Sequence, residues 1–271
     1  MRQWRLIIHD EPMSGSENMA VDEAILAEVS SGSQLPTLRL YAWSPFCLSL
    51  GYGQHASDAD LGRLHQSRFD VVRRPTGGKA ILHGAEMTYS LSLPISDELA
   101  QGDVVESYRR ISLALLAALS YLQLMPQSEP AAKGNSGLGP ICFEVPSHYE
   151  ITVEGRKLIG SAQVRRKQGI LQHGTLPIEA DVAAICDVLR YASDDERTLA
   201  KQHVHERALN LHEATGNSEI QWSHVADAYV QGFAETFDVD FIEGHLSNDE
   251  QRNALSLIES TYGDPGWTHR R

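Results

Sequence analysis

The chain has 271 residues, a formal net charge of −13 and 42% hydrophobic residues, which is typical of an ordinary soluble globular protein. An acidic chain has no global attraction to nucleic acid or to anionic membranes, so neither is an expected partner. Three cysteines without metal-binding spacing, no apolar run of the roughly 18 residues that span a bilayer and no secretory signal predict a cytoplasmic protein without a metal site or disulfides.

The first third of the chain alternates short strands with one helix. Ser14 and Glu17 have the spacing of a capping box, which predicts a helix through 18–29. Apolar or alternating runs that end at Pro, Gly or Ser predict strands around a glycine turn. These strands are predicted over 4–8, 37–43, 47–52, 71–74, 80–83 and 88–94.

The clearest helix is predicted over 104–122, where Ile111, Leu115 and Ala118 recur at helical spacing. Residues 126–140 are rich in Pro, Gly, Ser and Asn, which predicts a loop. A β-meander is expected after this loop. Its strands are predicted over 149–153, 157–164 and 170–178, and further helices over 181–190, 195–210, 223–237 and 247–261.

These elements favour an α+β fold, in which mixed and antiparallel β-sheets are flanked by helices. No repeat, low-complexity tract or convincing linker divides the chain. We therefore expect a single catalytic domain over 1–271 with a motif core at 37–240. The helical stretch 241–271 is expected to belong to the same unit, without an assigned role.

Residues 73–83 carry the densest functional signal. Arg73 and Arg74 enter a turn of Pro, Thr and two glycines, and an apolar run leads from the turn to His83. Paired glycines let the backbone approach a ligand closely, and adjacent guanidinium groups suit an anionic or thioester-bearing ligand. A purely structural turn and a structural histidine are the alternatives at this point.

A second candidate segment contains Cys142, which opens a strand after a Gly-rich loop. A thiol becomes a useful nucleophile as the thiolate, which requires a nearby cation, a base or a helix N-terminus. Lys157 is the candidate cation, because its strand is expected to pair with 149–153 through a hairpin turn at 154–155. The alternatives are a buried unreactive cysteine and a solvated strand lysine.

Five strings of the sequence resemble the superfamily of lipoate-protein ligases, octanoyltransferases and biotin ligases. They follow one another from the first predicted helix toward residue 240 and so cover most of the chain. The strings are Glu-Asn-Met-Ala-Val-Asp-Glu-Ala at 17–24, Leu-Ser-Leu-Gly-Tyr-Gly-Gln at 48–54, Arg-Arg-Pro-Thr-Gly-Gly-Lys-Ala-Ile-Leu-His at 73–83, Gly-Arg-Lys-Leu-Ile-Gly-Ser-Ala-Gln at 155–163 and Gln-His-Gly-Thr-Leu at 172–176.

Within the superfamily, Cys-Phe-Glu-Val-Pro-Ser-His-Tyr-Glu-Ile at 142–151 is most similar to the LipM-type octanoyltransferases. The nucleophilic cysteine of that family falls on Cys142, and its lysine falls on Lys157. ATP-using lipoate ligases usually have an Asn-Asp pair where this chain has residues 148–150, and they lack the cysteine. The Gly-Arg-Gly-Arg-x-Gly signature of biotin ligases is also missing.

The resemblance implies transfer of an octanoyl group from octanoyl-acyl carrier protein to a lysine of a lipoyl domain, through a thioester on Cys142. Acceptors of this kind are the glycine cleavage H protein and the E2 subunit of a 2-oxoacid dehydrogenase. The donor is already activated, so no ATP, metal or organic cofactor is required. An ATP-dependent lipoate-protein ligase, an octanoyl amidotransferase between lipoyl domains and a non-catalytic acyl-binding module are the alternatives.

The resemblance also implies the layout of the site. Catalysis is assigned to Cys142 and Lys157, and backbone N–H groups near 77–78 or 160–162 are candidates for stabilising an oxyanion. The remaining expected site residues bind substrate. They are Arg74, Thr76, Gly77, Gly78, His83, Gly160, Ser161, Ala162, His173, Gly174 and Thr175.

Two further expectations concern the substrates. The octanoyl chain needs an apolar tunnel, for which 80–82, Ile159 and Ala162 are the expected walls. The acyl carrier protein is acidic, so a local basic patch should dock it. The basic run 165–167, together with Arg73 and Arg74 (73–74), is the expected patch.

Overall fold

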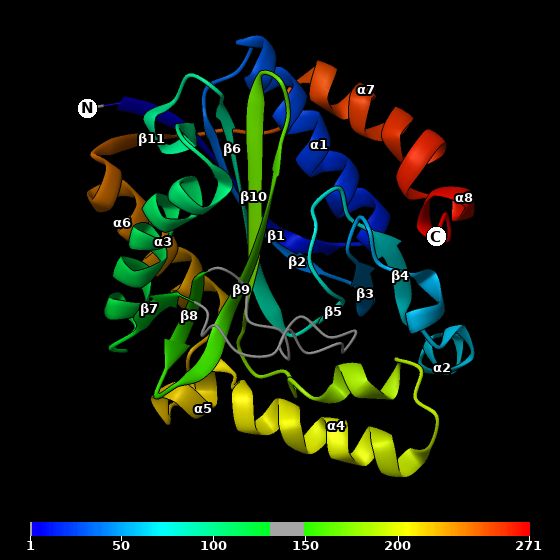
Figure 1. The fold of residues 1–271 in the computed structure, drawn as a ribbon. Coiled ribbons are helices and arrows are strands. Elements are labelled where there is room, and N and C mark those ends of the chain that lie inside the picture. Colours follow the sequence, from blue (N-terminus) through cyan, green and yellow to red (C-terminus); the bar gives the residue numbers. More distant parts are fainter. Residues whose placement is uncertain (1, 131–148) are drawn as a thin grey trace.

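The computed structural model describes residues 2–130 and 149–271, so Cys142 and His148 lie outside the described residues. A large mixed sheet runs through the molecule, with helices on both of its faces and a small second sheet beside it (Figure 1). The predicted α+β fold is confirmed. Among the described residues, no helix has the length and apolar character needed to cross a bilayer.

The large sheet has eight strands in the order β11-β1-β2-β6-β10-β9-β8-β7, and the small sheet has the order β4-β3-β5. Parallel pairs at β11-β1-β2 join antiparallel pairs through the rest of the large sheet. The strands are β1 (Arg2–Met13), β2 (Thr37–Trp43), β3 (Cys47–Leu50), β4 (Asp70–Arg73), β5 (Ile81–His83), β6 (Glu86–Pro94), β7 (Gln127–Pro130), β8 (Tyr149–Val153), β9 (Arg156–Arg165), β10 (Gly169–Pro177) and β11 (Val239–Glu243).

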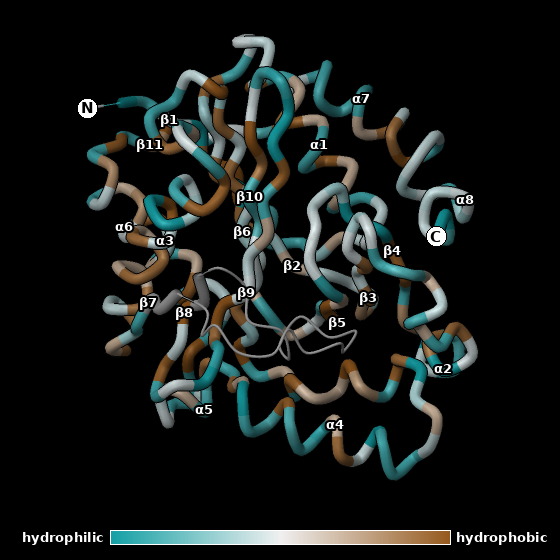
Figure 2. The backbone as a smooth tube through the Cα atoms, viewed as in Figure 1, coloured by the Kyte–Doolittle hydropathy of each residue, from teal (hydrophilic) through white to brown (hydrophobic). Residues whose placement is uncertain are grey.

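Helices α3 (Val104–Tyr121) and α6 (Trp222–Phe237) pack together over one face of the large sheet, and α1 (Gly15–Ser31) lies along β6 and β10 on the other face. The mostly hydrophilic α4 runs along one end of the molecule (Figure 2). The shorter helices are α2 (Leu61–Ser67), α4 (Asp194–Arg207), α5 (Leu211–Thr215), α7 (Asn248–Leu257) and α8 (Pro265–Thr268), with helical turns at Ala56–Asp58, Glu98–Ala100, Ala184–Asp187 and Ile258–Tyr262.

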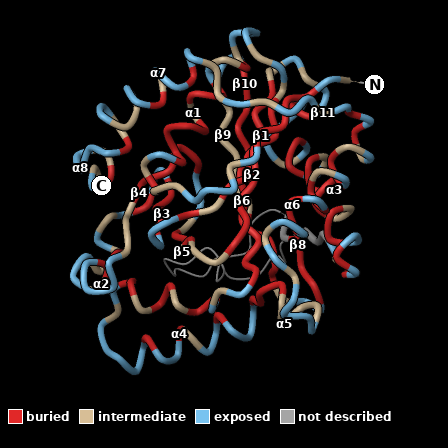
Figure 3. The backbone as a smooth tube through the Cα atoms, turned by 180° about the vertical axis from the view of Figure 1, so that it is seen from behind, coloured by how far each residue is buried: buried red, intermediate tan, exposed pale blue. Residues whose placement is uncertain are grey.

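Strand alternation gives the central strands one apolar and one polar face, although both faces are buried (Figure 3). Successive side chains of a strand point to opposite sides of the sheet. On β6, Ser90 faces α1 and donates to Asp22, whereas its neighbours Tyr89 and Leu91 join the apolar cluster under α3 and α6. The strand residues of β2 and β6 in that cluster are Leu38, Leu40, Met87, Tyr89, Leu91 and Leu93.

Several predicted elements are confirmed in detail. The capping box of Ser14 and Glu17 starts α1. The hairpin between β8 and β9 turns at Glu154 and Gly155, both with positive φ, and pairs Thr152 with Lys157. The strand over 37–43 and the helix that begins at residue 104 also match the prediction.

Other predicted elements differ from the structure. The helix expected over 181–190 is a turn with one 3₁₀ segment, because its apolar residues are buried together and do not form one helical stripe. The loop predicted over 126–140 starts with β7, which adds an edge strand to β8; the rest of that loop lies outside the described residues. Four further short elements were not predicted from the sequence, namely α2, α5, α8 and the edge strand β11.

The close packing of α3 against α6 predicts how a substitution at Gly232 would change the free energy of unfolding. A Cβ atom on Gly232 would lie 2.6 Å from the amide nitrogen of Ala118 and 2.7 Å from the carbonyl oxygen of Ala114. Because the backbone of α3 would have to move, Gly232→Ala should lower the free energy of unfolding by about 1–3 kcal/mol, measured by urea denaturation. Gly62→Ala, at an exposed position of α2, is the control and should not destabilise the protein. Equal stability of Gly232→Ala and wild type would contradict this packing.

Candidate active site

A pocket lies between α1, the turn after β4 and the β9–β10 hairpin. It encloses about 510 Å³ of empty space, part of which opens to solvent, and its exposed lining is mostly carbon. Met19, Trp43 and Ile81 contribute apolar walls from three different elements. The other lining residues are Tyr41, Ser49, Arg74, Gly78, His83, Thr88, Gly160, Ser161, Ala162, His173, Gly174 and Thr175.

The structure therefore brings most of the predicted binding residues to one pocket. Thr76 and Gly77 are the two that do not line it, and both contact Arg74 directly behind the lining. The remaining nine are Arg74, Gly78, His83, Gly160, Ser161, Ala162, His173, Gly174 and Thr175.

The expected tunnel walls are only partly found at the pocket. Ile81 and Ala162 line it. Ala80 packs in the apolar cluster beneath β3, and Ile159 packs under α3 and α6. Leu82 lines a neighbouring small cavity, which Ile81 also lines.

Arg74 holds the glycine turn against β3. Its guanidinium is buried and donates to the carbonyl oxygens of Gly77 and Lys79 at 2.9 and 2.7 Å. It also donates to the carbonyl and the hydroxyl of Ser49 at 2.9 and 3.1 Å, and to the hydroxyl of Thr76 at 3.2 Å. The turn is thus fixed by charge-assisted hydrogen bonds, which are stronger than neutral ones.

Arg73 points to the opposite side of the turn and anchors the C-terminal segment. Its fully buried guanidinium donates to the carbonyl oxygens of Gly51 and Gln54, both at 2.7 Å. It also donates twice to the carbonyl oxygen of Thr268, and the indole of Trp267 donates back to the Arg73 carbonyl at 2.9 Å. Arg73 is therefore a structural residue.

The predicted docking patch is wrong in its inclusion of Arg73 and Arg74, since backbone carbonyls inside the protein satisfy both guanidinium groups. The basic run 165–167 lies at the end of β9 and in the turn that leads to β10. On it, Arg165 donates to the Ala100 carbonyl, and the exposed Arg166 forms an ion pair with Glu23 at 3.2 Å.

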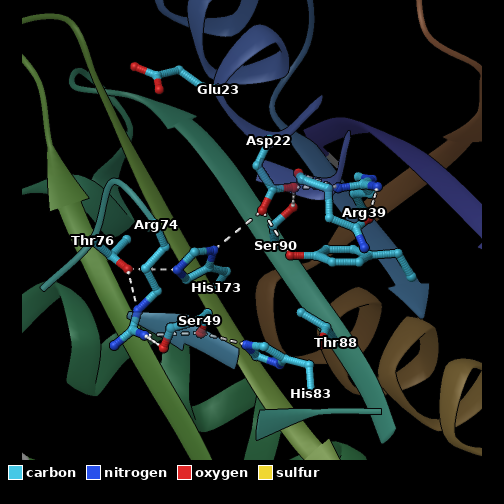
Figure 4. Close-up of polar contacts among 12 residues, drawn as sticks. Asp22, Glu23, Arg39, Ser49, Arg74, Thr76, His83, Thr88, Ser90 and His173 are labelled. Atoms are coloured by element: carbon cyan, nitrogen blue, oxygen red, sulfur yellow. Dashed lines mark hydrogen bonds and ion pairs between the residues drawn. The ribbon is translucent and has the colours of Figure 1, made fainter. Parts of the chain in front are cut away.

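Two hydrogen-bonded chains, each made of a carboxylate, an imidazole and a hydroxyl group, meet at Arg74 (Figure 4). In the first, Asp22 Oδ2 lies 3.3 Å from His173 Nδ1, and His173 Nε2 lies 2.7 Å from Thr76 Oγ1. A carboxylate only accepts, so His173 donates from Nδ1 and accepts the Thr76 hydroxyl proton at Nε2. Arg74 donates to that hydroxyl in turn.

The second chain contains Glu86, His83 and Ser49. Glu86 Oε1 lies 2.6 Å from His83 Nδ1, and His83 Nε2 lies 2.7 Å from Ser49 Oγ. Thr88 donates to the same Glu86 oxygen at 2.8 Å, and Trp43 donates to the Thr88 hydroxyl at 2.9 Å. Each histidine is therefore oriented by a carboxylate on one side and a hydroxyl on the other.

A buried ion pair between Asp22 and Arg39 stabilises the carboxylate end of the first chain. Asp22 accepts from Arg39 at 2.7 Å, from Ser90 at 2.7 Å and from the Tyr41 hydroxyl at 2.9 Å. Burial alone would raise the pKa of Asp22, but Arg39 and the hydrogen bonds from His173 and Ser90 hold that pKa below its ordinary value. Burial lowers the pKa of His173 despite the attraction of Asp22, so its imidazole is neutral near pH 7.

Lys157 is buried in β9 with its amine end beside the pocket. A Cβ atom built on Gly160, a lining residue, would lie 3.5 Å from Lys157 Cε and 4.0 Å from its Nζ. The alternative of a solvated strand lysine is therefore wrong. The role of Lys157 and its relation to Cys142 stay predictions, because Cys142 is outside the described residues.

The β9 backbone beside the pocket is hydrogen-bonded to a strand on one side. Residues 160–162 pair with β10, and the described pairing with β8 stops at Ile159 opposite Ile151. In an antiparallel pair, alternate residues exchange hydrogen bonds with one neighbour, and the residues between them point their N–H groups the other way. Within the described strands, one set of N–H groups at 160–162 thus points to an unpaired side.

Several residues of the pocket and its polar chains were not predicted from the sequence. Asp22, Ser49 and Glu86 are single polar residues in apolar surroundings, and Asp22 and Ser49 stand inside strings that carried the resemblance. The sequence signal that could have identified these residues is a polar side chain at a buried strand or helix position. The others are Met19, Arg39, Tyr41, Trp43, Thr88 and Ser90.

Comparisons with known proteins show which family and which fold the chain is similar to. The family model of the lipoyl protein ligase A/B catalytic domain matches residues 14–234. Octanoyltransferase LipM from Carboxydothermus hydrogenoformans is 40% identical and that from Kyrpidia tusciae 38% identical, each alignment covering 100% of both chains. In fold, the chain is similar to the structure of a bi-partite lipoate protein ligase and its E2 lipoyl domain from Thermoplasma acidophilum, with a TM-score of 0.83, 24% identity and coverage of 99% and 97% of the two chains.

The half-buried His9 and the buried His173 predict how stability depends on pH. Burial, followed by Arg39, lowers the pKa of His9 to about 4, and the pKa of His173 is also lowered. Unfolded histidines take up protons near pH ~6.5, so the stabilisation is complete above that pH and is lost as the pH falls toward 4.

His9→Gln removes one of these two groups. We expect its urea midpoint to fall less than that of wild type between pH 7 and pH 4.5. His203→Gln in α4, an exposed position, is the control and should keep the wild-type dependence. An equal loss in His9→Gln and wild type would contradict the assignment.

Proposed function

The chain belongs to the lipoyl protein ligase A/B catalytic-domain family, and on this premise we propose that it transfers octanoyl groups through a thioester on Cys142. Octanoyl transfer in protein lipoylation is the activity of this enzyme. The observation that supports the proposed course is the convergence of the strings at 73–83, 155–163 and 172–176 on one apolar pocket, with the Lys157 amine at its β9 wall.

The pocket takes the octanoyl chain. Met19, Trp43 and Ile81 exclude water from it, as ligand pockets with few polar groups do. Chain length is selected by the depth of the pocket, and one methylene group is worth roughly 1–3 kcal/mol, so neighbouring lengths react more slowly but are not rejected.

Thr175 supplies a polar contact for the acyl carbonyl. Its hydroxyl is buried at the pocket lining and has no hydrogen-bond partner among the described residues. An unpaired buried hydroxyl costs about 1–3 kcal/mol, and a bound carbonyl oxygen would remove that cost. The N–H groups at 160–162 that point away from β10 are the candidates for the oxyanion hole.

Cys142 and Lys157 carry the chemistry. The Cys142 thiolate attacks the acyl carbonyl of octanoyl-acyl carrier protein, and the bond to the carrier's thiol breaks. A neutral amine of the acceptor lysine then attacks the new thioester and loses a proton to the solvent, an amide forms, and Cys142 leaves as thiolate. The Lys157 ammonium favours the thiolate, and splitting the transfer into two steps is the gain of covalent catalysis.

The acceptor is a lipoyl domain, either of a glycine cleavage H protein or of a 2-oxoacid dehydrogenase E2. The fold neighbour from Thermoplasma acidophilum was determined together with its E2 lipoyl domain, which supports an acceptor of this class. A thiolate nucleophile requires a reducing compartment, so the enzyme works in the cytoplasm.

Intact-mass spectrometry tests the Cys142 assignment. Mixing the enzyme with octanoyl-acyl carrier protein should add one octanoyl group to wild type and none to Cys142→Ala, and apo lipoyl domain should then remove it from the wild-type enzyme. The adduct should be labile to neutral hydroxylamine, as a thioester is. ATP-dependent lipoylation that survives Cys142→Ala would instead identify a lipoate ligase.

Lys157→Met tests the role of the buried amine. Without the cation, the pKa of Cys142 should rise, so the pH at which iodoacetamide alkylates Cys142 half-maximally should rise, and acyl transfer should fall about 10²-fold. Lys201→Met in α4, whose amine pairs with Asp187, is the control and should change neither quantity. An unchanged alkylation profile in Lys157→Met would refute the thiolate-stabilising role.

A further inference from the structure

The chain of Glu86, His83 and Ser49 has the arrangement of a nucleophile, a base and a group that orients the base. Ser49 Oγ lies 2.7 Å from His83 Nε2, and His83 Nδ1 lies 2.6 Å from Glu86 Oε1. Hydrogen-bond distances of this kind, with the base oriented by a third group, identify an activated nucleophile. We propose that Ser49 is a second acyl acceptor in the pocket and gives the enzyme an acyl-hydrolase activity through an oxygen ester.

The imidazole of His83 is held in the orientation that this chemistry needs. Trp43 stacks on it with ring centroids 4.0 Å apart and planes 8° apart. Glu86 cannot rotate freely, because the same oxygen that meets His83 also accepts from Thr88. His83 Nδ1 therefore donates to the carboxylate, and the Nε2 lone pair is directed at the Ser49 hydroxyl.

Arg74 supplies positive charge at the nucleophile. Its Nη1 donates to Ser49 Oγ at 3.1 Å and would stabilise the alkoxide that develops as the proton leaves. Ser49 and His83 both line the apolar pocket, so an acyl group bound there lies next to Ser49. This step rests on the proposed binding of the octanoyl chain in the pocket.

The first chain does not offer the same chemistry, although Asp22, His173 and Thr76 have the same order of groups. Thr76 is not one of the residues that line the pocket. Ser161 lines the pocket but its hydroxyl pairs with the Tyr89 hydroxyl at 2.9 Å. Of these three hydroxyl groups, only that of Ser49 belongs to a lining residue and also contacts an imidazole.

The reaction is balanced without a cofactor. Ser49 Oγ attacks the acyl carbonyl while its proton passes to His83 Nε2. The bond from the carbonyl to the leaving thiol or alcohol breaks, and the leaving group takes the proton from His83. Water then attacks the ester, gives a proton to His83 and releases octanoate, and Ser49 regains its proton.

The Cys142→Ala enzyme tests this inference with p-nitrophenyl octanoate as the probe. We expect p-nitrophenol release about 10-fold or more above that of the Cys142→Ala/Ser49→Ala double variant. Peptide mapping should place the octanoyl group on Ser49 and leave Ser161 unmodified. The ester should resist neutral hydroxylamine, unlike the thioester on Cys142 of the wild-type enzyme.

Two further variants distinguish a chemical role of Ser49 from a folding defect. In the Cys142→Ala background, Ser49→Cys should carry a hydroxylamine-labile adduct at residue 49, and His83→Asn should slow p-nitrophenol release with Ser49 still present. Equal release by Cys142→Ala and the double variant, or acylation at another residue, would overturn the role of Ser49. The proposed transfer by Cys142 is read independently from the wild-type thioester.

Discussion

The pocket depends on the buried guanidinium of Arg74. Three segments of the chain meet around it, namely β3, the glycine turn and the β9–β10 hairpin. Arg74 donates to Ser49 of β3 and to the backbone of 77–79 in the turn. Thr76 of the turn also contacts His173 of β10. A buried cation is costly unless its donors are satisfied, and here backbone and hydroxyl oxygens satisfy them. The same contacts that stabilise the charge therefore fix the pocket walls relative to one another.

Both polar chains exist because a strand presents alternate residues to opposite faces. On β6 and β2, the apolar residues complete the core under α3 and α6, while Glu86, Ser90 and Arg39 face α1 and the pocket. The core and the site thus share the same strands. A one-residue shift in register would expose the core residues to the site and bury the polar ones in the core, so the fold and the site are specified together.

Local patterns predicted much of this structure. The capping box of α1 and the hairpin turn at Glu154-Gly155 are set by neighbouring residues, so the sequence sufficed for them. The glycine turn and the β9–β10 strings were also found, and the structure brings them together. The sequence could not reveal that Arg73 and Arg74 point inward, because their partners are carbonyl groups, which are present at every residue. Asp22 was missed because its partner His173 is far away in the chain.

The contact between Arg73 and Thr268 constrains the order of events during synthesis. These residues are separated by 195 positions, and the guanidinium that stiffens one side of the glycine turn has its acceptor in the C-terminal segment. While the ribosome is still making the middle of the chain, β4 and the turn can form only with that charge hydrated. Contacts between such distant residues form late and slow folding. A nascent chain therefore gains this buried contact only after its C-terminal segment has been made.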